Sequence, residues 1–447
     1  MSKSLPEEFL LSTESLLGPD RFAIFMDAME QEPPVSIRVN PWKAALPWPP
    51  AAFADGVCER VGWCEEGYYL PLRPNFTFDP LLHAGCYYVQ EAASMMVSHV
   101  ARSLLTAPGS FVLDLCAAPG GKSTALRSVL PPGCLLVSNE PVRQRAQVLS
   151  ENMQKWGHPD SMVTNCHARD FVSAGTEGLF SLIVCDVPCS GEGMFRKDPD
   201  SIGEWSTANV ARCQRLQRQI VSEIWPCLRP GGILVYSTCT YNVHENEENV
   251  RWLQEQTGAD ILCVPTAEEW GITGSLLKGF HAPVCRFIPG LTRSEGLFMA
   301  VLRKRDDDGR AATREEQARK RLQTLDMGQT TAQKNRKHAD GPTAREALSV
   351  SLDRSKYAMA ELPYPTAIAY LRREAIALPE GTPTGYVIVT FRGHPLGFVK
   401  NIGPRANNLY PREWAIRSSH VPESYDEVWK EEGVRRSRKE LEGVRSR

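Results

Sequence analysis

Two cysteines that follow apolar runs are the side chains best placed for chemistry. Cys189 lies in the segment IVCDVPCSGEGMF, and Cys239 lies in GGILVYSTCTYN. Each thiol comes at the end of a predicted strand, so both should face the carboxyl edge of one sheet, where the ligands of such folds bind. This placement favours reactive thiols and covalent chemistry. Most cysteines are small buried hydrophobic residues, and we interpret four others in that way: Cys116, Cys134, Cys185 and Cys227.

Two glycine-rich turns accompany these strands. The first, DLCAAPGGKS from Asp114 to Ser123, joins a predicted strand to a predicted helix. Its backbone N–H groups can therefore hold the polar part of a nucleotide-type cofactor. The second, Ser190 to Gly193, directly follows Cys189, and we expect a flexible turn that can approach a substrate closely. A cofactor loop beside two thiols indicates methyl transfer through a cysteine adduct.

Acidic residues near the next strand ends are candidates for further cofactor contacts. Glu140 ends the strand after the glycine-rich turn, 19 residues beyond Gly121. A carboxylate at this position suits the hydroxyl pair of a ribose. Asp170 is the next such acid, after the run SMVTN, and could accept a hydrogen bond from an adenine amino group. The alternative for both is an ordinary surface carboxylate.

The glycine-rich turn resembles two other cofactor motifs only in part. A phosphate-binding P-loop needs a glycine five residues before Gly121, and Cys116 stands there. A nicotinamide site prefers the pattern G-x-G-x-x-G, whereas this turn reads A-A-P-G-G-K and is stiffened by Pro119. Nucleotide hydrolysis and hydride transfer are therefore disfavoured.

Cysteine usage and hydropathy limit the cellular setting. The chain has 13 cysteines and no C-x-x-C pair, which argues for reduced thiols and against a structural zinc site, so we expect no metal. The first residues include acidic side chains where a signal peptide would have a basic patch. No apolar run is long enough to span a bilayer. We expect a cytoplasmic monomer that does not associate with membranes.

The apolar pattern divides the 447 residues into several units. Short apolar runs at 111–115, 134–140, 181–187 and 231–238 alternate with helical segments. This is typical of a parallel sheet covered on both faces, so we predict a doubly wound α/β central domain. The predicted order along the chain is a small α+β domain at 1–80, the central domain at 81–302, a charged linker at 303–344, a mostly β module at 345–426 and a charged tail at 427–447.

The carboxyl-terminal third carries an excess of positive charge. Residues 303–447 hold 28 Lys and Arg against 20 Asp and Glu, although the whole chain has a net charge of −2. A solvated charged surface is one interpretation, and contact with a polyanion is the other. Basic residues of the β module accompany two aromatic ones, which indicates RNA binding by phosphate contact and stacking: Lys400, Arg405, Arg412, Tyr410 and Trp414. A packed β core with a charged exterior is the alternative.

Seven segments together resemble one family, the Nol/Nop/Sun RNA cytosine-5 methyltransferases, and within it the bacterial RsmF-type ribosomal RNA enzymes. The resemblance spans residues 36–304, and its paired PCSG and TCT signatures are highly specific. Residues 397–411, GFVKNIGPRANNLYP, also resemble the PUA-like carboxyl-terminal segment of these enzymes. The seven segments are SIRVN at 36, YYVQEAASMM at 87, DLCAAPGGKS at 114, SNEP at 138, DVPCSGEGMFRKDP at 186, GGILVYSTCT at 231 and SEGLFMAVLRK at 294.

The resemblance implies a Rossmann-like methyltransferase domain between an RNA-binding-type amino-terminal domain and a PUA-like module. It implies that S-adenosylmethionine is the cofactor, with Glu140 at its ribose and Asp170 near its adenine. The thiol of TCT, Cys239, would add to cytosine C6, and Cys189 would serve product release. Asp186 would hold the base edge and lie close to the cofactor. The loop residues implied as cofactor contacts are Cys116, Ala117, Ala118, Pro119, Gly120, Gly121 and Lys122.

The implied function is formation of 5-methylcytosine in small-subunit ribosomal RNA, free or in the assembled subunit. Transfer RNA as the substrate and a non-catalytic assembly protein are the alternatives. DNA cytosine methylation is a third, since those enzymes use the cysteine after proline and carry Glu-Asn-Val, which is present here at 248–250. Their F-x-G-x-G loop is absent, however, so we interpret the tripeptide as part of a helix. The chain departs from the family at Val187, usually alanine, and at Pro289-Gly290, often Pro-His.

Overall fold

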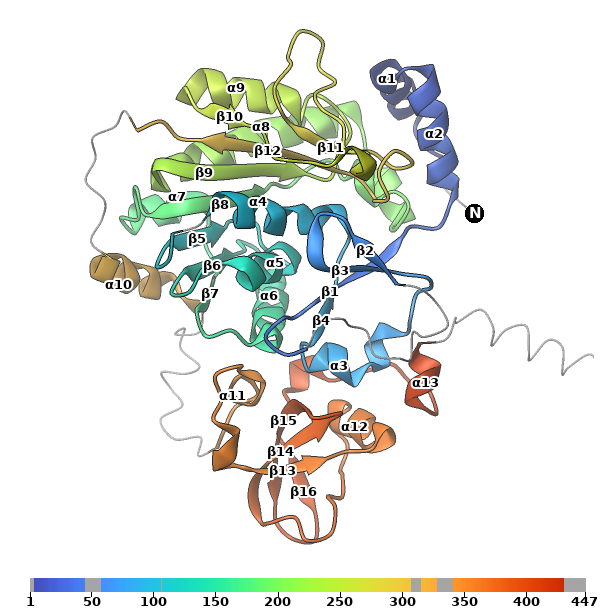
Figure 1. Cartoon of the computed structure of the whole chain (residues 1–447), viewed down its shortest axis with the longest axis vertical. Helices are drawn as coiled ribbons and strands as arrows, with labels where there is room; N and C mark the ends of the chain where they lie inside the picture. The colour runs from blue at the N-terminus through green and yellow to red at the C-terminus, as the bar shows by residue number, and fades with distance from the viewer. Residues whose placement is uncertain (1–3, 45–57, 106, 307–314, 328–340, 430–447) are drawn as a thin grey trace, which may run out of the picture.

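A computed structural model describes residues 4–44, 58–105, 107–306, 315–327 and 341–429 (Figure 1). Its strands form three sheets, one in each predicted folded unit. Among these described residues, no helix has the length and apolar character that crossing a membrane requires.

The amino-terminal unit begins with two helices, α1 (Glu7–Leu17) and α2 (Pro19–Glu30), which lie beside the central domain in Figure 1. An antiparallel sheet of order β2-β3-β1-β4 follows. Its last strand follows the short helix α3 (Pro80–His83) and lies beyond residue 80, where the sequence places the boundary of this unit. The strands are β1 (Val35–Val39), β2 (Glu59–Val61), β3 (Cys64–Leu70) and β4 (Tyr87–Val89).

The central sheet has the order β10-β12-β9-β8-β5-β6-β7, and β11 pairs with β12. The five strands from β9 to β7 are parallel, as expected from their apolar runs. The sheet is nevertheless mixed, because β12 pairs with β9 in the antiparallel direction, as do β10 and β11 with β12. The strands are β5 (Phe111–Asp114), β6 (Leu135–Asn139), β7 (Ser161–Thr164), β8 (Phe180–Asp186), β9 (Leu228–Thr238), β10 (Asp260–Leu262), β11 (Cys285–Phe287) and β12 (Leu297–Arg303).

Helices cover both faces of this sheet, because alternate strand residues point to opposite sides. Val112 and Val184 pack with helices α4, α5 and α6 on one face. Leu113 and Ile183, their neighbours in sequence, pack with helices α7, α8 and α9 on the other. The α/β class and the layered core are confirmed. The helices are α4 (Met96–Leu104), α5 (Gly121–Val129), α6 (Arg143–Trp156), α7 (Ala168–Ser173), α8 (Thr207–Ile224) and α9 (Glu247–Thr257).

The carboxyl-terminal module is a third sheet of order β13-β14-β15-β16. Its central pair is the predicted hairpin, whose turn uses positive φ angles of 50° at Arg392 and 76° at Gly393. Helix α10 (Glu315–Leu325) lies in the predicted linker, and Leu322 is buried against the central domain. The remaining elements are α11 (Ala344–Leu348), β13 (Ala358–Glu361), α12 (Tyr364–Leu371), β14 (Gly385–Phe391), β15 (His394–Asn401), β16 (Ala406–Asn408) and α13 (Tyr425–Val428).

The first and third units share one hydrophobic core. Phe78 and Tyr87 of the amino-terminal unit pack in the same cluster as Tyr364 and Trp429 of the module. A hydrogen bond reinforces the contact, since the Tyr364 hydroxyl donates to the Phe78 carbonyl over 3.2 Å. Within the amino-terminal unit, the buried Asp79 carboxylate accepts from the Tyr87 hydroxyl at 2.6 Å and so fixes a ring of the shared core. The module is therefore part of one folded assembly with the amino-terminal sheet.

This core corrects the predicted role of two aromatic residues. Tyr410 and Trp414 are only 1% and 7% exposed, because they pack within the shared cluster. Neither ring can stack on a base without unfolding the module. The packed-core alternative is the one that the structure supports for both, while Lys400, Arg405 and Arg412 remain exposed.

Arg38 of β1 joins the amino-terminal sheet to the start of the central domain. The guanidinium group is fully buried and lies 4.6 Å from the centre of the Trp156 ring. It donates to the Gln90 side chain at 2.8 Å and to the Thr124 hydroxyl of α5 at 2.5 Å. Burial lowers the pKa of Arg38 to about 10, which leaves it charged at neutral pH. Helix α5, which follows the glycine-rich turn, is thus held from outside the central domain.

Truncation after residue 340 is expected to lower the thermal stability of the remaining chain. Phe78, Leu81 and Tyr87 would lose their cover, and each large apolar side chain is worth about 1.5–3 kcal/mol when buried. Thermal unfolding and the binding of a hydrophobic dye measure this effect. Arg405→Ala, which removes an exposed side chain of the same module, is the control and should leave the melting temperature unchanged. An unaltered melting temperature after truncation would contradict the shared core.

Candidate active site

The two predicted thiols lie side by side at the carboxyl edge of the central sheet. Cys189 follows β8 and Cys239 follows β9, and these parallel strands are in register at Asp186 and Ser237. The two sulfur atoms are 3.3 Å apart, within reach of an S–H···S hydrogen bond. This bond and burial raise the pKa of Cys189 well above its usual value. Cys189 therefore keeps its proton and can donate it toward the Cys239 sulfur.

A buried glutamate fixes the turn after Cys189. Glu192 is 1% exposed, and one of its carboxylate oxygens accepts from the backbone N–H groups of Tyr241 and Asn242 at 2.6 and 3.0 Å. The Gly193 N–H donates to the Cys239 carbonyl at 2.7 Å, and a Cβ atom at Gly193 would lie 2.7 Å from that oxygen. Glycine is required there because the two loops touch. The expected flexible turn is instead tightly held.

A second buried glutamate, in the segment after β9, supports the same turn together with Gln217 of helix α8. The Glu245 carboxylate accepts from the Ser190 N–H at 3.0 Å and from the Gln217 side chain at 2.6 Å. Gln217 also donates to the Pro188 carbonyl at 2.9 Å. Burial raises the pKa of Glu245, although these hydrogen bonds oppose the shift. The sequence did not indicate Glu192, Glu245 and Gln217 as functional positions. Their contacts join segments that are far apart in the chain, and no sequence motif marks such contacts.

Asp186 and Lys122 connect the thiols to the glycine-rich turn. Their side chains form an ion pair of 2.8 Å, and the Ser237 hydroxyl donates to the other Asp186 oxygen at 2.7 Å. Burial alone would lower the pKa of Lys122, but the adjacent Asp186 outweighs it, so the pKa is raised and the ammonium stays charged. The predicted base-binding carboxylate is thus held between a lysine of α5 and a serine of β9, at the carboxyl ends of β8 and β9.

The glycine-rich turn is shaped by helix α6. The Arg145 side chain donates to the Ala118 carbonyl at 3.1 Å, and Asn152 donates to the Pro119 carbonyl at 2.8 Å. Gly120 has a φ of 116°, a left-handed conformation that favours glycine, and α5 begins directly after it. The first N–H groups of a helix have no partner within the helix. They are therefore available to a polar ligand at this turn.

The three acids near the turn have different environments. Glu140 follows β6 as expected and is 1% exposed, and it accepts from the Val142 N–H at 2.9 Å. Asp170 does not lie at a strand end. It lies in the first turn of α7, and it caps this helix by accepting a hydrogen bond from the His167 N–H at 2.8 Å. Asp114 is fully buried, and the Ser123 hydroxyl donates to one of its oxygens at 2.6 Å.

Comparison with known proteins gives a consistent assignment for all three units. Residues 101–303 match the family described as 16S rRNA methyltransferase RsmB/F. Residues 5–92 match the N-terminal domain of 16S rRNA methyltransferase RsmF, and residues 359–416 match the RsmF PUA domain. The chain belongs to the RsmB/F family. The resemblance found in the sequence is confirmed, with both accessory domains of the RsmF type.

Individual relatives agree with this assignment. Ribosomal RNA small subunit methyltransferase F of Pectobacterium atrosepticum is 33% identical over 67% of this chain, which spans 63% of that relative's length. The protein of the same name from Escherichia coli O81 is 29% identical over 91% of this chain and 96% of its own. A crystal structure of NSun6 from Pyrococcus horikoshii with SFG has a TM-score of 0.57 at 20% identity, covering 68% of this chain and 99% of that one. The last comparison shows a shared fold.

The RsmB/F family uses S-adenosylmethionine, and the residues around the turn fit this cofactor. In the part of the chain that the structure describes, the second Asp114 oxygen and the Ser138 hydroxyl are buried without a hydrogen-bond partner. These two residues are paired on adjacent strands β5 and β6, at the turn. Buried polar groups normally have partners. A polar ligand seated at the turn would supply them.

Replacing Asp114 by asparagine is expected to change how stability depends on pH. Burial raises the pKa of Asp114 to about 7 from a usual value near 3.8. Between these values the folded state binds more protons than the unfolded state, so this carboxyl makes the free energy of unfolding fall as pH rises from about 4 to 7. Denaturant unfolding at several pH values should show a smaller fall in Asp114→Asn. The same pH dependence in both proteins would contradict the raised pKa.

Proposed function

We propose that this chain is an S-adenosylmethionine-dependent methyltransferase that forms 5-methylcytosine in 16S ribosomal RNA through a covalent adduct at Cys239. The observation that carries the proposal is the pair of thiols at 3.3 Å, beside the Asp186 and Lys122 ion pair. Membership of the RsmB/F family and the names of the relatives support the RNA substrate. The fixed turns around both thiols are what a catalytic site needs.

Cytosine C5 is a poor nucleophile until a sulfur atom adds to C6. In the proposed reaction the Cys239 thiolate forms a bond to C6, which makes C5 electron-rich. The Cys189 thiol, with its raised pKa, donates a hydrogen bond that stabilises this thiolate before the addition. Asp186 accepts a hydrogen bond from the exocyclic amino group or the protonated N3 of the base. Residues 116–122, Glu140 and Asp170 would hold S-adenosylmethionine at the glycine-rich turn, and the bound cofactor would supply the methyl group.

The adduct must then lose a proton from C5 and the sulfur from C6. Once Cys239 is bonded to carbon, its sulfur no longer carries a negative charge next to Cys189. The part of the pKa shift that came from Cys239 is thereby removed, so the half-buried Cys189 thiol gives its own proton to solvent, and the resulting thiolate is the base that takes the C5 proton. The electron pair of the broken C5–H bond restores the C5–C6 double bond, and Cys239 leaves as a thiolate. Each thiol thus has a separate role.

The environment of Asn249 argues against the DNA enzyme alternative. Its side chain is buried in helix α9 and donates to the Gln217 side chain at 2.7 Å and to the Tyr236 hydroxyl at 3.0 Å. Asn249 therefore supports the turn after Cys189 through Gln217, which donates to the Pro188 carbonyl. The complete set of thiols and ion pair likewise argues against a non-catalytic assembly protein. We place the reaction in the cytoplasm, on free RNA or an assembled subunit.

S-adenosylhomocysteine is expected to raise the melting temperature of the wild-type chain, whereas NAD and ATP are not. A ligand present at 100 times its Kd stabilises the folded state by about 2.7 kcal/mol. Lys122→Met should reduce the shift because it removes the cation that orients Asp186 beside the turn. The measurement is the melting temperature of each protein, without ligand and with each ligand in turn. Stabilisation by ATP alone would overturn the cofactor assignment.

The two thiols are expected to fail at different steps. Cys239→Ala should abolish both methylation and any covalent complex with RNA, since no adduct can form. Cys189→Ala should add to the base and methylate once, then stay attached to its RNA as a slowly migrating band under denaturing electrophoresis. Cys263→Ala, at an exposed thiol, is the control and should behave as wild type. The reversed pattern, with trapping by Cys239→Ala, would place the nucleophile at Cys189.

A further inference from the structure

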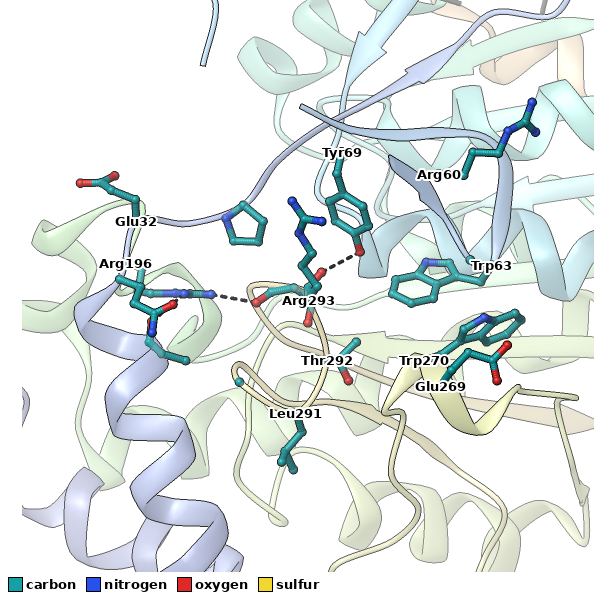
Figure 2. Close-up of a pocket in the computed structure, with 16 residues that line it drawn as sticks. Glu32, Arg60, Trp63, Tyr69, Arg196, Glu269, Trp270, Leu291, Thr292 and Arg293 are labelled. Carbon is teal, nitrogen blue, oxygen red and sulfur yellow. Dashed lines mark hydrogen bonds between the residues drawn. The ribbon is translucent and has the colours of Figure 1, made fainter. Parts of the chain in front are cut away.

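A cavity of about 760 Å³ lies between the amino-terminal unit and the central domain, apart from the cofactor turn. Figure 2 shows Arg196 at one end of it and the indole rings of Trp63 and Trp270 at the other. Arg293 lies between them, and its backbone carbonyl accepts from the Tyr69 hydroxyl at 2.8 Å. We call this space the interdomain cavity. Nothing in the proposed reaction at the two thiols uses it.

Two buried polar groups at the interdomain cavity have no hydrogen-bond partner in the described part of the chain. The Arg196 side chain is 7% exposed, and its terminal nitrogens donate to the Ala28 and Ser294 carbonyls, both at 2.8 Å. Its Nε atom has no hydrogen-bond partner among the residues that the structure describes, and the same holds for the buried Ser294 hydroxyl. Both residues line the cavity. Since buried donors are normally satisfied, these two point to a ligand with hydrogen-bond acceptors.

The opposite end of the cavity is aromatic. The Trp63 nitrogen donates to the Ala92 carbonyl at 2.7 Å, which fixes this ring. Trp270 meets it edge to face at 5.9 Å and an angle of 67°, and its ring lies against the backbone of Gly62. Trp270 is half-buried, so part of its indole ring is open to a ligand. A planar aromatic group is the ligand that such a surface favours.

The charges around the cavity favour a nucleobase over a free phosphate inside it. Arg60, Arg196 and Arg293 line it together with Glu32 and Glu269. Arg196 is also paired with the buried Glu295 at 3.2 Å, and Arg293 is paired with Glu59 at 2.6 Å. The interior is therefore close to neutral, whereas Arg60 and Arg293 are exposed and can meet a phosphate at the rim. A nucleobase inside the cavity suits the neutral interior, and the sugar-phosphate backbone outside it suits the two exposed arginines.

The cavity is close to the thiols through the chain itself. Gly193 donates its N–H to the Cys239 carbonyl at 2.7 Å, and Arg196 follows three residues later. Three residues span at most about 10 Å. A Cβ atom at Gly193 would also lie 3.2 Å from the Glu295 carbonyl, next to Ser294. The segments 193–196 and 294–296 thus touch the thiol site at one end and the cavity at the other.

A glycine shapes one wall of this cavity. Gly290 lines it next to helix α2. Its φ is +86°, and a Cβ atom there would lie 2.7 Å from the Ile24 carbonyl of α2. A larger residue would push α2 away. Glycine at position 290 therefore allows α2 to lie close to this wall of the cavity.

We propose that the interdomain cavity binds the base of one unpaired nucleotide that neighbours the target cytosine in the RNA. This rests on the proposed function for the identity of the polymer. The base stacks on Trp270, and its acceptor atoms receive hydrogen bonds from Arg196 Nε and Ser294 Oγ. The adjoining phosphates contact Arg60 and Arg293. The nucleotide is held while its neighbour occupies the thiol site, so the cavity contributes to the choice of target.

Ser294→Ala in the full chain is the first test, because the hydroxyl that it removes has no hydrogen-bond partner among the residues described here. The melting temperature should not fall. The Kd for a 16S rRNA transcript, measured by filter binding, should rise about fivefold for one lost hydrogen bond. In methylation assays KM for RNA should rise and kcat should stay constant. Ser161→Ala is the matched control, since its hydroxyl is also buried and has no partner within the described ranges, but lies on β7, away from the cavity lining.

Trp270 supplies a second measurement. Trp270→Ala should raise the Kd for the transcript roughly tenfold by removing a stacking surface, while Trp270→Phe should restore most of the affinity. S-adenosylhomocysteine binding should be the same in all of these variants. Wild-type RNA affinity in both Ser294→Ala and Trp270→Ala would overturn the cavity proposal, even if the wild-type chain methylates 16S rRNA. Weaker binding by both, in a chain that does not methylate this RNA, would support the cavity and overturn the proposed function.

Discussion

The parallel pairing of β8 with β9 is the interaction on which the whole site depends. Its register sets Asp186 opposite Ser237, and the two thiols follow within a few residues at a distance of 3.3 Å. A slip of one residue would turn every side chain of one strand to the other face. The register is fixed by packing on both faces, since Val184 and Val235 enter one hydrophobic core while Cys185 and Tyr236 enter the other. The pairing that forms this part of the sheet therefore also brings the two thiols together.

Strand pairing alone does not hold the loops that carry the sulfur atoms. Two buried carboxylates do so, Glu192 from within the turn and Glu245 from the segment after β9. Each accepts several N–H donors, which is how a buried carboxylate is tolerated away from water. Rigid loops make the S–H···S contact persistent, and that contact raises the pKa of Cys189. The difference between the two thiols in the proposed reaction thus originates in hydrogen bonds to backbone atoms.

The sequence predicted those features that have a local pattern. Apolar runs located the parallel strands, and strand-end positions located Cys189, Cys239 and the cofactor turn. The antiparallel direction of β12 was not predictable, because a buried run reads the same in either direction. Neither were the supporting contacts of Glu192 or the burial of Tyr410, since both depend on residues far away in the chain. Tertiary packing determines all three of these features.

Contacts between the three units also affect the geometry of the site. The carboxyl-terminal module shares its core with the amino-terminal sheet, so the module holds β1 in place. From β1, Arg38 reaches α5 and bonds to Thr124, two residues after Lys122. Lys122 in turn pairs with Asp186 at the thiols. Because every link is buried or half-buried, a disturbance of the module should be transmitted to the ion pair. The module therefore contributes to the geometry of the site through its core, whatever RNA contacts its exposed basic residues make.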